Sequence, residues 1–463
     1  MYKLSLDKPS HVHFIGIGGV SMSGLAAILL DRGFAVSGSD AHASDLTRKL
    51  EEAGAKIHYE QVASNITDDI EAVVYTAAIH PTNPEYAAAV EKGLTLITRA
   101  ELLGQMMQQY RIPICVSGTH GKTTTTSMAA HVLLAAETDP TVSVGGMLPL
   151  IGGNYRIGST DYFLMEACEY TNSFLSFFPK IGIILDIDAD HLDFFKDLED
   201  IRNSFRKFAE LIPEDGRLII NADDPACKMI SKDLICSVVT YSAQGGKADY
   251  TADLISYNEH GNASFRAKAK GKDLGTFTLE VPGQHNVANA LAVIALGCEL
   301  GLDAGTLRKG FSSFRGTNRR FEYKGMVNNV TIIDDYAHHP TEIKATLRTA
   351  QKVPHETIWC VFQPHTYTRT KALLPQFAEA LAIADKVLVA DIYAARELDI
   401  YGISSGDLAE EIQKLGTDCL YLPTFSEIED HLRAQIRPGD LVITMGAGNI
   451  VQVGESLLQG GQA

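Results

Sequence analysis

A glycine loop followed by a lysine and several hydroxyls stands at residues 117–126, which read SGTHGKTTTT. A strand-like run leads into the loop and a helix-forming run follows it. Glycines let backbone N–H groups approach phosphates, and a helix start adds partial positive charge. In such a loop Lys122 can reach the β and γ phosphates of a nucleotide, and the Thr123 hydroxyl can bind Mg²⁺. Val116 stands where the common spacing needs glycine, so the loop is the shorter Gly118–Thr123.

A second glycine turn lies near the N-terminus, where residues 16–24 read GIGGVSMSG between a strand-like run and a helical pattern. Ser21 stands where the strict dinucleotide pattern has glycine, and Asp40 ends the next strand-like run, where a ribose-binding carboxylate is expected. The turn therefore predicts a site for a nucleotide diphosphate. It does not separate NAD from a UDP-sugar, and the alternative is a turn needed only for tight packing.

Unusual polar side chains follow several strand-like runs, at the ends where open α/β sheets bind ligands. They are Glu166 and Glu169; Asp186, Asp188, Asp190, His191 and Asp193; Asp334, Asp335, Tyr336, His338 and His339; and His365, Tyr367 and Arg369. A carboxylate and an imidazole beside a triphosphate suit Mg²⁺, so we expect Glu166 and His191 to join Thr123 as metal ligands. The alternatives are solvated loop carboxylates and structural histidines, and we expect one of the adjacent pair His338–His339 to be structural.

Composition limits the class of protein. The chain has 463 residues, enough for roughly two to four domains. Its formal net charge of −17 disfavours binding to nucleic acid and to anionic membranes. Its seven cysteines include no C-x-x-C pair, which fits a reducing compartment and argues against a zinc site. We see no signal peptide and no apolar run of about 18 residues, so we expect a cytoplasmic protein.

Three segments alternate strand-like and helical patterns, which predicts an α/β fold with three domains. We expect a Rossmann-like domain over 1–107, a phosphate-loop ATPase-type α/β domain over 108–320 and a C-terminal Rossmann-like domain over 321–463. The polar stretch RGTNRR marks the last boundary. Strands are predicted at 11–17, 34–40, 72–76, 94–97, 112–116, 162–165, 181–187, 217–221, 330–334, 357–362, 386–391 and 440–445.

The chain resembles the Mur ligase family over essentially its whole length, and within it the alanine-adding branch. The matching strings, in chain order, are HFIGIGGVSMSGLA, SGSD, SGTHGKTTTT, DADHLD, GQHNVANALA, NRRFE, DDYAHHPTE, FQPHTYTRT and MGAGNI. No single string is decisive, but their order and spacing across all three segments make the resemblance specific.

The resemblance implies a role for each matching residue. The residues implied to bind a UDP-sugar are Gly16, Gly18, Gly19, Ser39, Asp40, Tyr336 and His338. Those implied to bind ATP are Gly118, Thr119, His120, Gly121, Lys122, Thr123, Thr124, His285, Asn286, Asn289, Arg320 and Asp335. The amino acid would bind His365 and Arg369, and the metal would bind Thr123, Glu166 and His191. The implied catalytic residues are Lys122, Glu166, His191, Arg320, His338 and His339.

The activity that the resemblance implies is an ATP-dependent ligation in peptidoglycan precursor synthesis, and hence in cell-wall growth and division. The lactyl carboxylate of UDP-N-acetylmuramate would attack the γ-phosphorus of ATP, and the amine of L-alanine would then attack the resulting acyl phosphate. Two anions meet in the first step, so Mg²⁺, Lys122 and Arg320 are needed to neutralise charge. His338 or His339 is the expected base for the amine. We expect a monomer or a homodimer.

Three positions depart from the family pattern. Thr366 stands where many alanine-adding members have arginine, which leaves Arg369 as the main cation for the amino-acid carboxylate. Cys168 replaces an aspartate that usually follows Glu166. Residues 202–204 occupy the region where several sister ligases carry a carbamylated lysine, and they include no lysine, so we predict no carbamate.

Other readings remain open at this point. The nearest is a sister ligase that adds a tripeptide to UDP-N-acetylmuramate in recycling, or a later peptide-adding ligase. The short HH and HxYTR motifs favour the alanine-adding branch, because a longer acceptor needs a roomier and more basic pocket. Folylpolyglutamate synthetases lack this N-terminal segment. A nicotinamide-dependent dehydrogenase leaves Lys122 unexplained, and a phosphate-loop switch or motor protein leaves the N-terminal turn unexplained.

Overall fold

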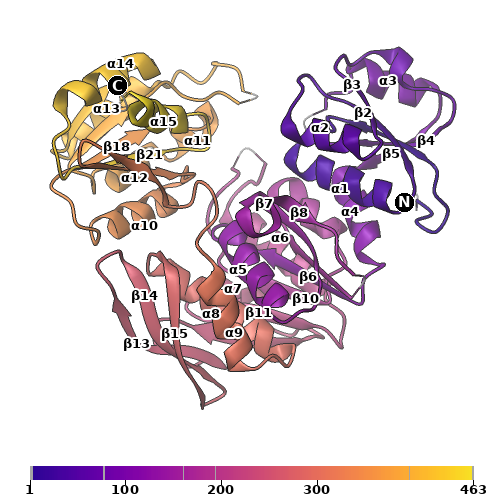
Figure 1. Cartoon of the computed structure of the whole chain (residues 1–463), viewed down its shortest axis with the longest axis horizontal. Coiled ribbons are helices and arrows are strands. Elements are labelled where there is room, and N and C mark those ends of the chain that lie inside the picture. Colours follow the sequence, from indigo (N-terminus) through magenta and orange to yellow (C-terminus); the bar gives the residue numbers. More distant parts are fainter. Residues whose placement is uncertain (1–3, 77–78, 160, 193, 396, 461–463) are drawn as a thin grey trace. The chain divides into compact units, whose positions relative to one another are not determined.

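A computed structural model describes residues 4–76, 79–159, 161–192, 194–395 and 397–460, so Asp193, one of the acidic candidates, lies outside the described residues. The chain divides into two compact units, Met1–Ile187 with Arg202–Thr240, and Asp188–Ile201 with Tyr241–Ala463. The elements of each unit can be followed by colour and label in Figure 1. The three domain ranges given above stay a prediction.

The first sheet of the chain is wholly parallel, in the order β3-β2-β1-β4-β5. Its strands are β1 (His11–Ile15), β2 (Ala35–Ser39), β3 (Lys56–His58), β4 (Ile70–Tyr75) and β5 (Thr95–Thr98). The helices between them are α1 (Val20–Asp31), α2 (Asp45–Glu52), the 3-10 turn η1 (Ala63–Asn65), α3 (Pro84–Glu91) and α4 (Arg99–Met107). This strand order, which reverses beside β1, is that of a doubly wound fold and confirms the predicted Rossmann-like class.

Local sequence explains where these helices begin. Ser44 before α2 and Thr98 before α4 each form a capping box with the third helical residue. The side chain of Asn83 caps α3, whose first residue is a proline. Most residues of β1 and β4 are buried, as expected for strands of a parallel sheet covered on both faces.

The phosphate-loop segment forms a second set of strands in the same unit, in the order β11-β10-β6-β9-β7-β8. They are β6 (Ile112–Ser117), β7 (Thr141–Leu148), β8 (Gly153–Arg156), β9 (Tyr162–Glu166), β10 (Ile181–Ile184) and β11 (Arg217–Asn221), with helices α5 (Lys122–Ala135), η2 (Pro149–Ile151), η3 (Tyr170–Ser176), α6 (Leu198–Glu210) and α7 (Pro225–Ile230). β6 pairs in parallel with β9 and β10. The loop after β6 therefore lies at the carboxyl edge of the sheet, beside the ends of β9 and β10.

An antiparallel meander follows, and the sequence patterns predict none of its strands. It consists of β13 (Tyr250–Tyr257), β14 (Asn262–Ala269) and β15 (Lys272–Pro282), and it precedes α8 (His285–Glu299) and α9 (Ala304–Ser313). The strand before it, β12 (Ser237–Ser242), pairs in parallel with β13 and was not predicted either. β14 pairs antiparallel with both β13 and β15. Its side chains alternate between buried and partly exposed, as in a sheet with one packed face.

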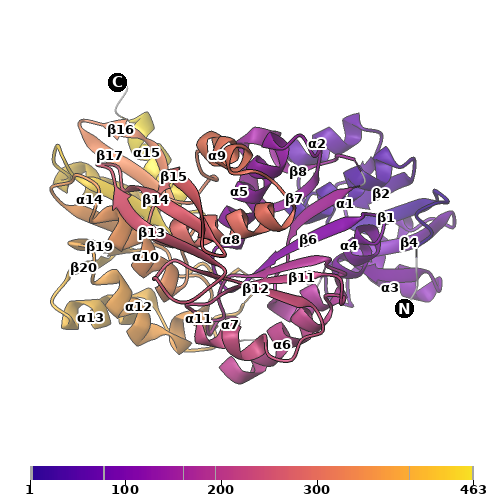
Figure 2. The ribbon, with the colours of Figure 1, turned by 90° about the horizontal axis from the view of Figure 1, so that it is seen from below.

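The C-terminal sheet has the order β16-β17-β21-β18-β19-β20, in which only β16 with β17 is antiparallel. Its strands are β16 (Glu322–Val327), β17 (Val330–Asp335), β18 (Ile358–Phe362), β19 (Lys386–Val389), β20 (Asp418–Tyr421) and β21 (Leu441–Met445). The helices are α10 (Pro340–Ala350), α11 (Tyr367–Ala372), α12 (Leu374–Leu381), α13 (Ser405–Lys414), α14 (Phe425–Gln435) and α15 (Val451–Gln459). Helices α10, α12 and α13 cover one face and α14 and α15 the other, as Figure 2 shows.

Each strand predicted by residue range is present, and the differences lie at strand ends. β10 ends at Ile184 rather than at Ile187, because the N–H of Ile187 donates to the side chain of Asp224 instead of continuing the ladder. Among the described helices, none has both the length and the apolar character needed to cross a membrane.

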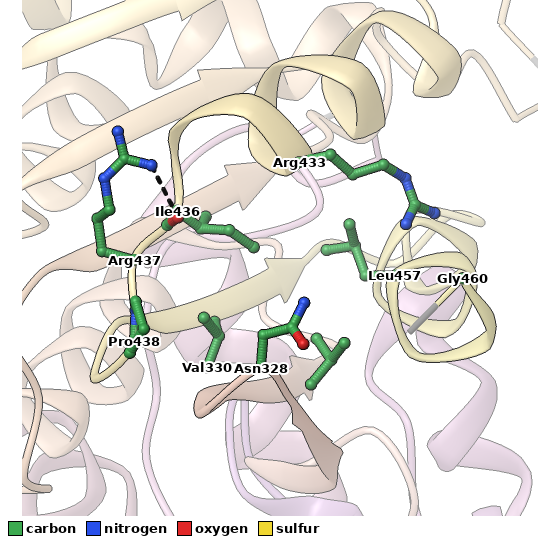
Figure 3. Close-up of a pocket in the computed structure, with 9 residues that line it drawn as sticks. Asn328, Val330, Arg433, Ile436, Arg437, Pro438, Leu457 and Gly460 are labelled. Atoms are coloured by element: carbon green, nitrogen blue, oxygen red, sulfur yellow. Dashed lines mark hydrogen bonds between the residues drawn. The ribbon is translucent and has the colours of Figure 1, made fainter. Parts of the chain in front are cut away.

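A pocket of about 280 Å³ lies in the C-terminal part of the chain, where the β16–β17 hairpin meets α14 and α15 (Figure 3). Its lining residues are Val327, Asn328, Val330, Arg433, Ile436, Arg437, Pro438, Leu457 and Gly460. None of the predicted site residues is among them, so the pocket is separate from the predicted site.

Candidate active site

The predicted phosphate loop lies between the end of β6 and the start of α5. Gly118 (φ 142°) and Gly121 (φ 81°) both have backbone conformations that favour glycine. A Cβ atom at Gly118 would lie only 2.9 Å from Oδ1 of Asp186, so a larger residue would not fit. Thr123 and Thr124 follow in the first turn of α5 and are both partly exposed. The loop thus has the glycine backbone and the helix start that phosphate binding requires.

Lys122, the first residue of α5, directs its ammonium group back into the loop. Its Nζ donates to the carbonyl oxygens of Gly118 (2.6 Å) and Thr119 (3.1 Å) and to Oε2 of Glu169 (3.0 Å). Burial alone would lower the pKa of Lys122, but the Glu169 carboxylate outweighs burial and the net pKa is raised. The lysine is therefore held as a cation within the phosphate loop.

Thr123 and Glu166, two of the three predicted metal ligands, lie together at the same sheet edge. Oγ1 of Thr123 donates to Oε2 of Glu166 (3.1 Å), and the N–H of Gly145 donates to Oε1 (2.6 Å). A hydroxyl and a carboxylate beside a phosphate loop are the hard oxygen ligands that Mg²⁺ prefers. The residues present therefore fit a magnesium ion. The third predicted ligand, His191, belongs to the other compact unit.

Two neighbours of the loop had no role assigned from the sequence. Oδ1 of Asp186 accepts the N–H of His120 (2.9 Å), and its carbonyl oxygen accepts the N–H of Thr119 (3.2 Å). Burial raises the pKa of Asp186 to about 6. Cys168 is partly buried, and burial together with Glu169 raises the pKa of its thiol to about 11. Asp186 thus fixes the backbone of the loop, whereas Cys168 is an uncharged neighbour at pH 7.

The N-terminal glycine turn is fastened to the end of β2. Two successive N–H groups, beginning at Gly16, donate to the carbonyl oxygen of Ser39 (2.8 and 2.9 Å). The N–H of Gly18 donates to Oδ2 of Asp40 (2.8 Å), and a Cβ atom at Gly18 would lie 2.8 Å from that oxygen. Helix α1 begins directly after Gly19. The turn therefore offers a helix start, as anion-binding turns do.

The side chains of Ser39 and Asp40 both form hydrogen bonds to other residues of the protein. Ser39 is fully buried, and its hydroxyl donates to Oε2 of Glu85 (2.6 Å). Besides Gly18, Asp40 accepts the N–H of Ala41 through Oδ1 (2.8 Å). Both residues thus shape the turn, and their direct contacts with a UDP-sugar stay a prediction.

In the second unit, two consecutive arginines flank a tyrosine ring. The guanidinium carbons of Arg319 and Arg320 lie 5.0 and 5.3 Å from the centroid of Tyr336. Nε of Arg319 donates to Oδ2 of Asp334 (2.9 Å), and its two other nitrogens donate to backbone carbonyls of the loop after β21 (2.9 and 2.7 Å). Arg320 has a looser ion pair, with Glu342 at 3.9 Å. Arg319 is thus structural, and Arg320 is the one of the two suited to a ligand.

Asp335, predicted to contact the ATP ribose, accepts a backbone N–H on each of its two carboxylate oxygens. Oδ2 accepts the N–H of Phe321 (2.8 Å), and Oδ1 accepts the N–H of Ala337 (2.7 Å). Burial raises the pKa of Asp335 to about 6. The carboxylate holds the linker against the loop after β17, and its contact with ribose stays a prediction.

The predicted adenine-side residues lie together at the start of α8. Nδ2 of Asn286 donates to the carbonyl of Pro282 (2.7 Å), and Nδ2 of Asn289 donates to Oδ1 of Asn286 (3.0 Å). Burial, with a smaller effect from Arg320, lowers the pKa of His285 to about 4. His285 is therefore neutral at pH 7, and the two asparagines form one connected pair.

The two adjacent histidines have different surroundings. His339 caps α10: its Nδ1 accepts the N–H of Thr341 (3.3 Å), and its Nε2 donates to the carbonyl of Ala189 (3.1 Å). Nδ1 of His338 donates to the carbonyl of Tyr336 (3.0 Å), which leaves the lone pair on Nε2. Burial lowers the pKa of His338 to about 4. His339 therefore supports the start of α10, and its catalytic role stays a prediction; of the two, His338 is the better placed proton acceptor.

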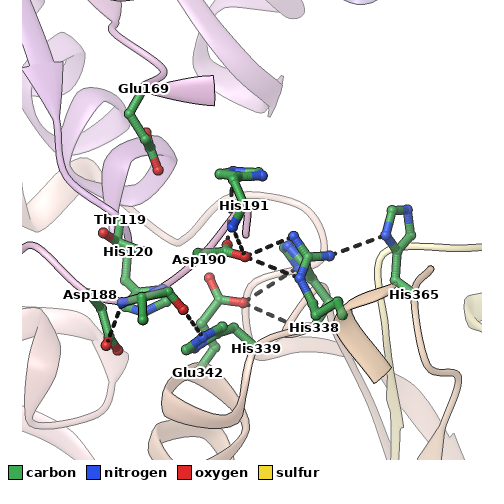
Figure 4. Close-up of polar contacts among 12 residues, drawn as sticks. Thr119, His120, Glu169, Asp188, Asp190, His191, His338, His339, Glu342 and His365 are labelled. Atoms are coloured by element: carbon green, nitrogen blue, oxygen red, sulfur yellow. Dashed lines mark hydrogen bonds and ion pairs between the residues drawn. The ribbon is translucent and has the colours of Figure 1, made fainter. Parts of the chain in front are cut away.

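Arg369, predicted to bind the amino-acid carboxylate, is held by the buried Asp190, which is labelled together with His365 in Figure 4. Nε and Nη2 of Arg369 both donate to Oδ1 of Asp190 (3.1 and 3.0 Å), and Nη1 lies 3.3 Å from Nδ1 of His365. The two side chains are only 11 % and 8 % exposed. Burial would raise the pKa of Asp190, but Arg369 outweighs it and holds this pKa well below its usual range. No sequence pattern predicted this ion pair.

His191, the remaining predicted metal ligand, follows Asp190 directly. The backbone N–H of His191 donates to Oδ1 of Asp190 (2.7 Å), and the ring Nε2 of His191 lies 3.8 Å from Oδ2 of Asp190. The backbone φ of His191 is 53°, a conformation that costs energy in a residue other than glycine and persists only where the surroundings impose it. Asp190 therefore positions both His191 and Arg369.

Comparison with known families covers most of the chain. The models that match are the Mur ligase family catalytic domain over residues 11–111, the Mur ligase middle domain over 116–297 and the Mur ligase glutamate ligase domain over 319–448. A UDP-N-acetylmuramate–L-alanine ligase from Lachnospira eligens is 56 % identical over 459 residues, which cover 99 % of this chain and all of that one. A protein of the same name from Agathobacter rectalis is 55 % identical with the same coverage.

Solved structures agree with the sequence comparison. The UDP-N-acetylmuramate-alanine ligase MurC from Thermotoga maritima is 30 % identical with a TM-score of 0.82, over 98 % of this chain and 99 % of that one. A murein peptide ligase from Psychrobacter arcticus is 26 % identical with a TM-score of 0.71, over 97 % and 98 % of the two chains.

Two Rossmann-like sheets and a phosphate loop with its lysine and carboxylate define a nucleotide-binding α/β protein. The family models and the full-length relatives make the assignment more specific. The chain belongs to the Mur ligase family, as its motifs predict.

Proposed function

We propose that this protein is an ATP-dependent ligase that joins L-alanine to the lactyl carboxylate of UDP-N-acetylmuramate in peptidoglycan precursor synthesis. The observation that carries the proposal is its identity of 50–56 %, over essentially the full chain, to relatives that bear the name UDP-N-acetylmuramate–L-alanine ligase. The phosphate loop, with Lys122 inside it and Thr123 beside Glu166, supports the use of ATP.

In the first step the lactyl carboxylate attacks the γ-phosphorus of ATP, the bond to the β-phosphate oxygen breaks, and ADP leaves an acyl phosphate behind. The ATP phosphates occupy the loop Gly118–Thr124, and Lys122 exchanges the loop carbonyls for phosphate oxygens. Arg320, whose ion pair with Glu342 is long, adds a second positive charge. These charges lower the repulsion between two anions, which is the main barrier to this step.

In the second step the amine of L-alanine attacks the acyl carbon, and the tetrahedral intermediate collapses to the amide and phosphate. Arg369 binds the carboxylate of L-alanine on its side facing His365. His338 accepts the amine proton at Nε2, because its Nδ1 already donates to a carbonyl and its ring is neutral at pH 7.

A divalent cation completes the proposed site. Thr123, Glu166 and His191 would hold Mg²⁺, and the ion would neutralise charge on the transferring phosphoryl group. The seven cysteines, all within the described residues, are free thiols, in keeping with the proposed cytoplasmic location. The absence of nucleic-acid binding and the oligomeric state, monomer or homodimer, stay predictions.

Phosphate release, measured with Mg·ATP and UDP-N-acetylmuramate, tests the proposal. Each amino acid is added singly, and one sample receives a muropeptide-derived tripeptide. Release that needs both the sugar nucleotide and L-alanine, with weaker release for serine and glycine, is the expected result. Release only with the tripeptide would move the chain to the recycling ligases. Release with ATP alone would contradict a ligase altogether.

A further inference from the structure

A fully buried carboxylate lies at the centre of polar contacts in the N-terminal sheet region. Glu85, in the first turn of α3, has no exposed surface. Its Oε2 accepts the hydroxyl of Ser39 (2.6 Å), and its Oε1 accepts Nδ2 of Asn65 (2.6 Å). Nε2 of His13 lies 3.6 Å from Oε2. The carboxylate thus joins α3 to β1, to the end of β2 and to η1.

The same contacts extend from this carboxylate to the surface. Nδ1 of His13 lies 2.8 Å from the hydroxyl of Ser37, and that hydroxyl lies 2.8 Å from Nε2 of His11. Nδ1 of His11 lies 2.7 Å from Oδ2 of Asp69, whose side chain is exposed. Burial would raise the pKa of Glu85, but the nearby His13 ring together with the hydrogen bonds from Ser39 and Asn65 outweighs burial and lowers it. Glu85 therefore stays ionised at neutral pH.

Ser39 connects this carboxylate to the glycine turn. Its side chain is bound to Glu85, while its carbonyl oxygen accepts the N–H groups of Gly16 and Ile17 (2.8 and 2.9 Å). The next residue, Asp40, accepts the N–H of Gly18. A change in the orientation of Ser39 would therefore move the first N–H groups of the turn.

We propose that Glu85 is a positioning residue for the sugar nucleotide, which acts by fixing Ser39 and, through the Ser39 carbonyl, the backbone of the turn at Gly16 and Ile17 that supports the proposed diphosphate site. This inference rests on the proposed function, which places UDP-N-acetylmuramate at this turn. Glu85 itself does not contact the ligand, since it is fully buried behind Ser39.

The site needs a carboxylate because two donors converge on it. The Ser39 hydroxyl and the Asn65 amide each donate to one carboxylate oxygen, and a glutamine would offer one oxygen and one N–H₂ group. In a Glu85→Gln variant the N–H₂ group would face one of these donors, and the Ser39 hydroxyl, which can also accept, would have to rotate to restore a hydrogen bond. The remaining groups would then have to rotate, and Ser39 is the one attached to the turn.

Binding of UDP to the full chain, measured by isothermal titration calorimetry, tests the proposal together with steady-state kinetics. Glu85→Gln is expected to raise both the Kd for UDP and the KM for UDP-N-acetylmuramate by about 10-fold, the effect of roughly one lost buried hydrogen bond. The KM values for ATP and L-alanine should stay within about 2-fold, because their binding groups make no contact with Glu85. Glu91→Gln is the matched control, since it makes the same chemical change at the exposed end of the same helix.

The outcomes separate positioning from folding. A merely structural role would lower the melting temperature and kcat while leaving the Kd of the folded fraction unchanged, and that result would overturn the proposal. If Glu85→Gln does not fold, Ser39→Ala removes the same contact but leaves Asn65 and His13 on the carboxylate, and an unchanged Kd would again refute it. If the wild-type chain does not bind UDP, the assignment of the turn fails first. Binding by wild type, with no change in Glu85→Gln, overturns the role of Glu85 alone.

Discussion

Removal of Glu169 tests how the phosphate loop keeps its lysine in place. Nζ of Lys122 lies 3.0 Å from Oε2 of Glu169, and the side chains are 16 % and 2 % exposed. Removing one partner of a buried pair costs about 3–5 kcal/mol. Lys122 keeps its bonds to two loop carbonyls and some contact with water, so we expect Glu169→Gln to lose roughly 2–3 kcal/mol of unfolding free energy.

Thermal denaturation with and without Mg·ATP is the assay. For a compact unit of this size, that loss corresponds to a fall in Tm of about 4–12 °C. In Glu169→Gln, Lys122 lacks its carboxylate partner, and ATP would bring negative charge to it. Saturating Mg·ATP should therefore raise the Tm of Glu169→Gln more than that of wild type and reduce the difference between the two Tm values. Linkage requires the same change to appear as tighter ATP binding by the variant.

Glu210→Gln is the control for this experiment. It makes the same chemical change in a surface ion pair with Arg206, where the side chains are 52 % and 29 % exposed, and should cost less than about 1 kcal/mol. A Tm for Glu169→Gln equal to that of Glu210→Gln would show that the ion pair does not stabilise the loop. If Mg·ATP leaves the Tm difference between wild type and Glu169→Gln unchanged, ATP does not replace Glu169 as the partner of Lys122.

Three further predictions concern the proposed reaction. Arg369→Ala should raise the KM for L-alanine by at least about 10-fold, the loss of a charged hydrogen bond, while the KM for ATP stays nearly constant; equal effects on both would remove Arg369 from the amino-acid pocket. Chelation of divalent cations by EDTA should stop phosphate release, and Thr123→Ala should raise the Mg²⁺ concentration needed to restore it; an unchanged requirement would remove Thr123 from the metal site. The folded pKa of His338, about 4, lies below its unfolded value, so the unfolded chain binds more protons between those values and stability falls as pH drops from about 6.5 to 4. His338→Gln should remove up to roughly 3 kcal/mol of that pH-dependent loss of unfolding free energy. If denaturation curves show that the unfolding free energies of wild type and His338→Gln fall equally over this pH range, the assignment is contradicted.

The sequence predicts those parts of the site that local pattern encodes. Strand, glycine loop and lysine are consecutive in the chain, so Gly118 and Lys122 could be placed on one sheet edge before the structure was known. The carboxyl ends of parallel strands meet at one edge, which is why Glu166 lies beside Thr123 although 43 residues separate them.

No local sequence pattern indicates the side-chain contacts between residues far apart in the chain. Asp190 and Arg369 are 179 residues apart, and Ser39 and Glu85 are 46 apart; neither spacing belongs to a repeat or to a helix period. The β13–β15 meander also escaped prediction, because exposed apolar residues such as Leu254, at 72 %, interrupt its alternation. Its strands are defined by pairing with each other rather than by composition.

Cys168, where the family pattern has an aspartate, has a consequence for chemical reactivity. The thiolate is the nucleophilic form of cysteine, and a pKa of about 11 leaves roughly one Cys168 side chain in 10⁴ as thiolate at pH 7. A cysteine beside an ATP site would ordinarily be a target for electrophiles and peroxides. Here burial and the negative charge of Glu169 keep the thiol protonated, so we expect Cys168 to react slowly with electrophiles and peroxides although it lies near Lys122.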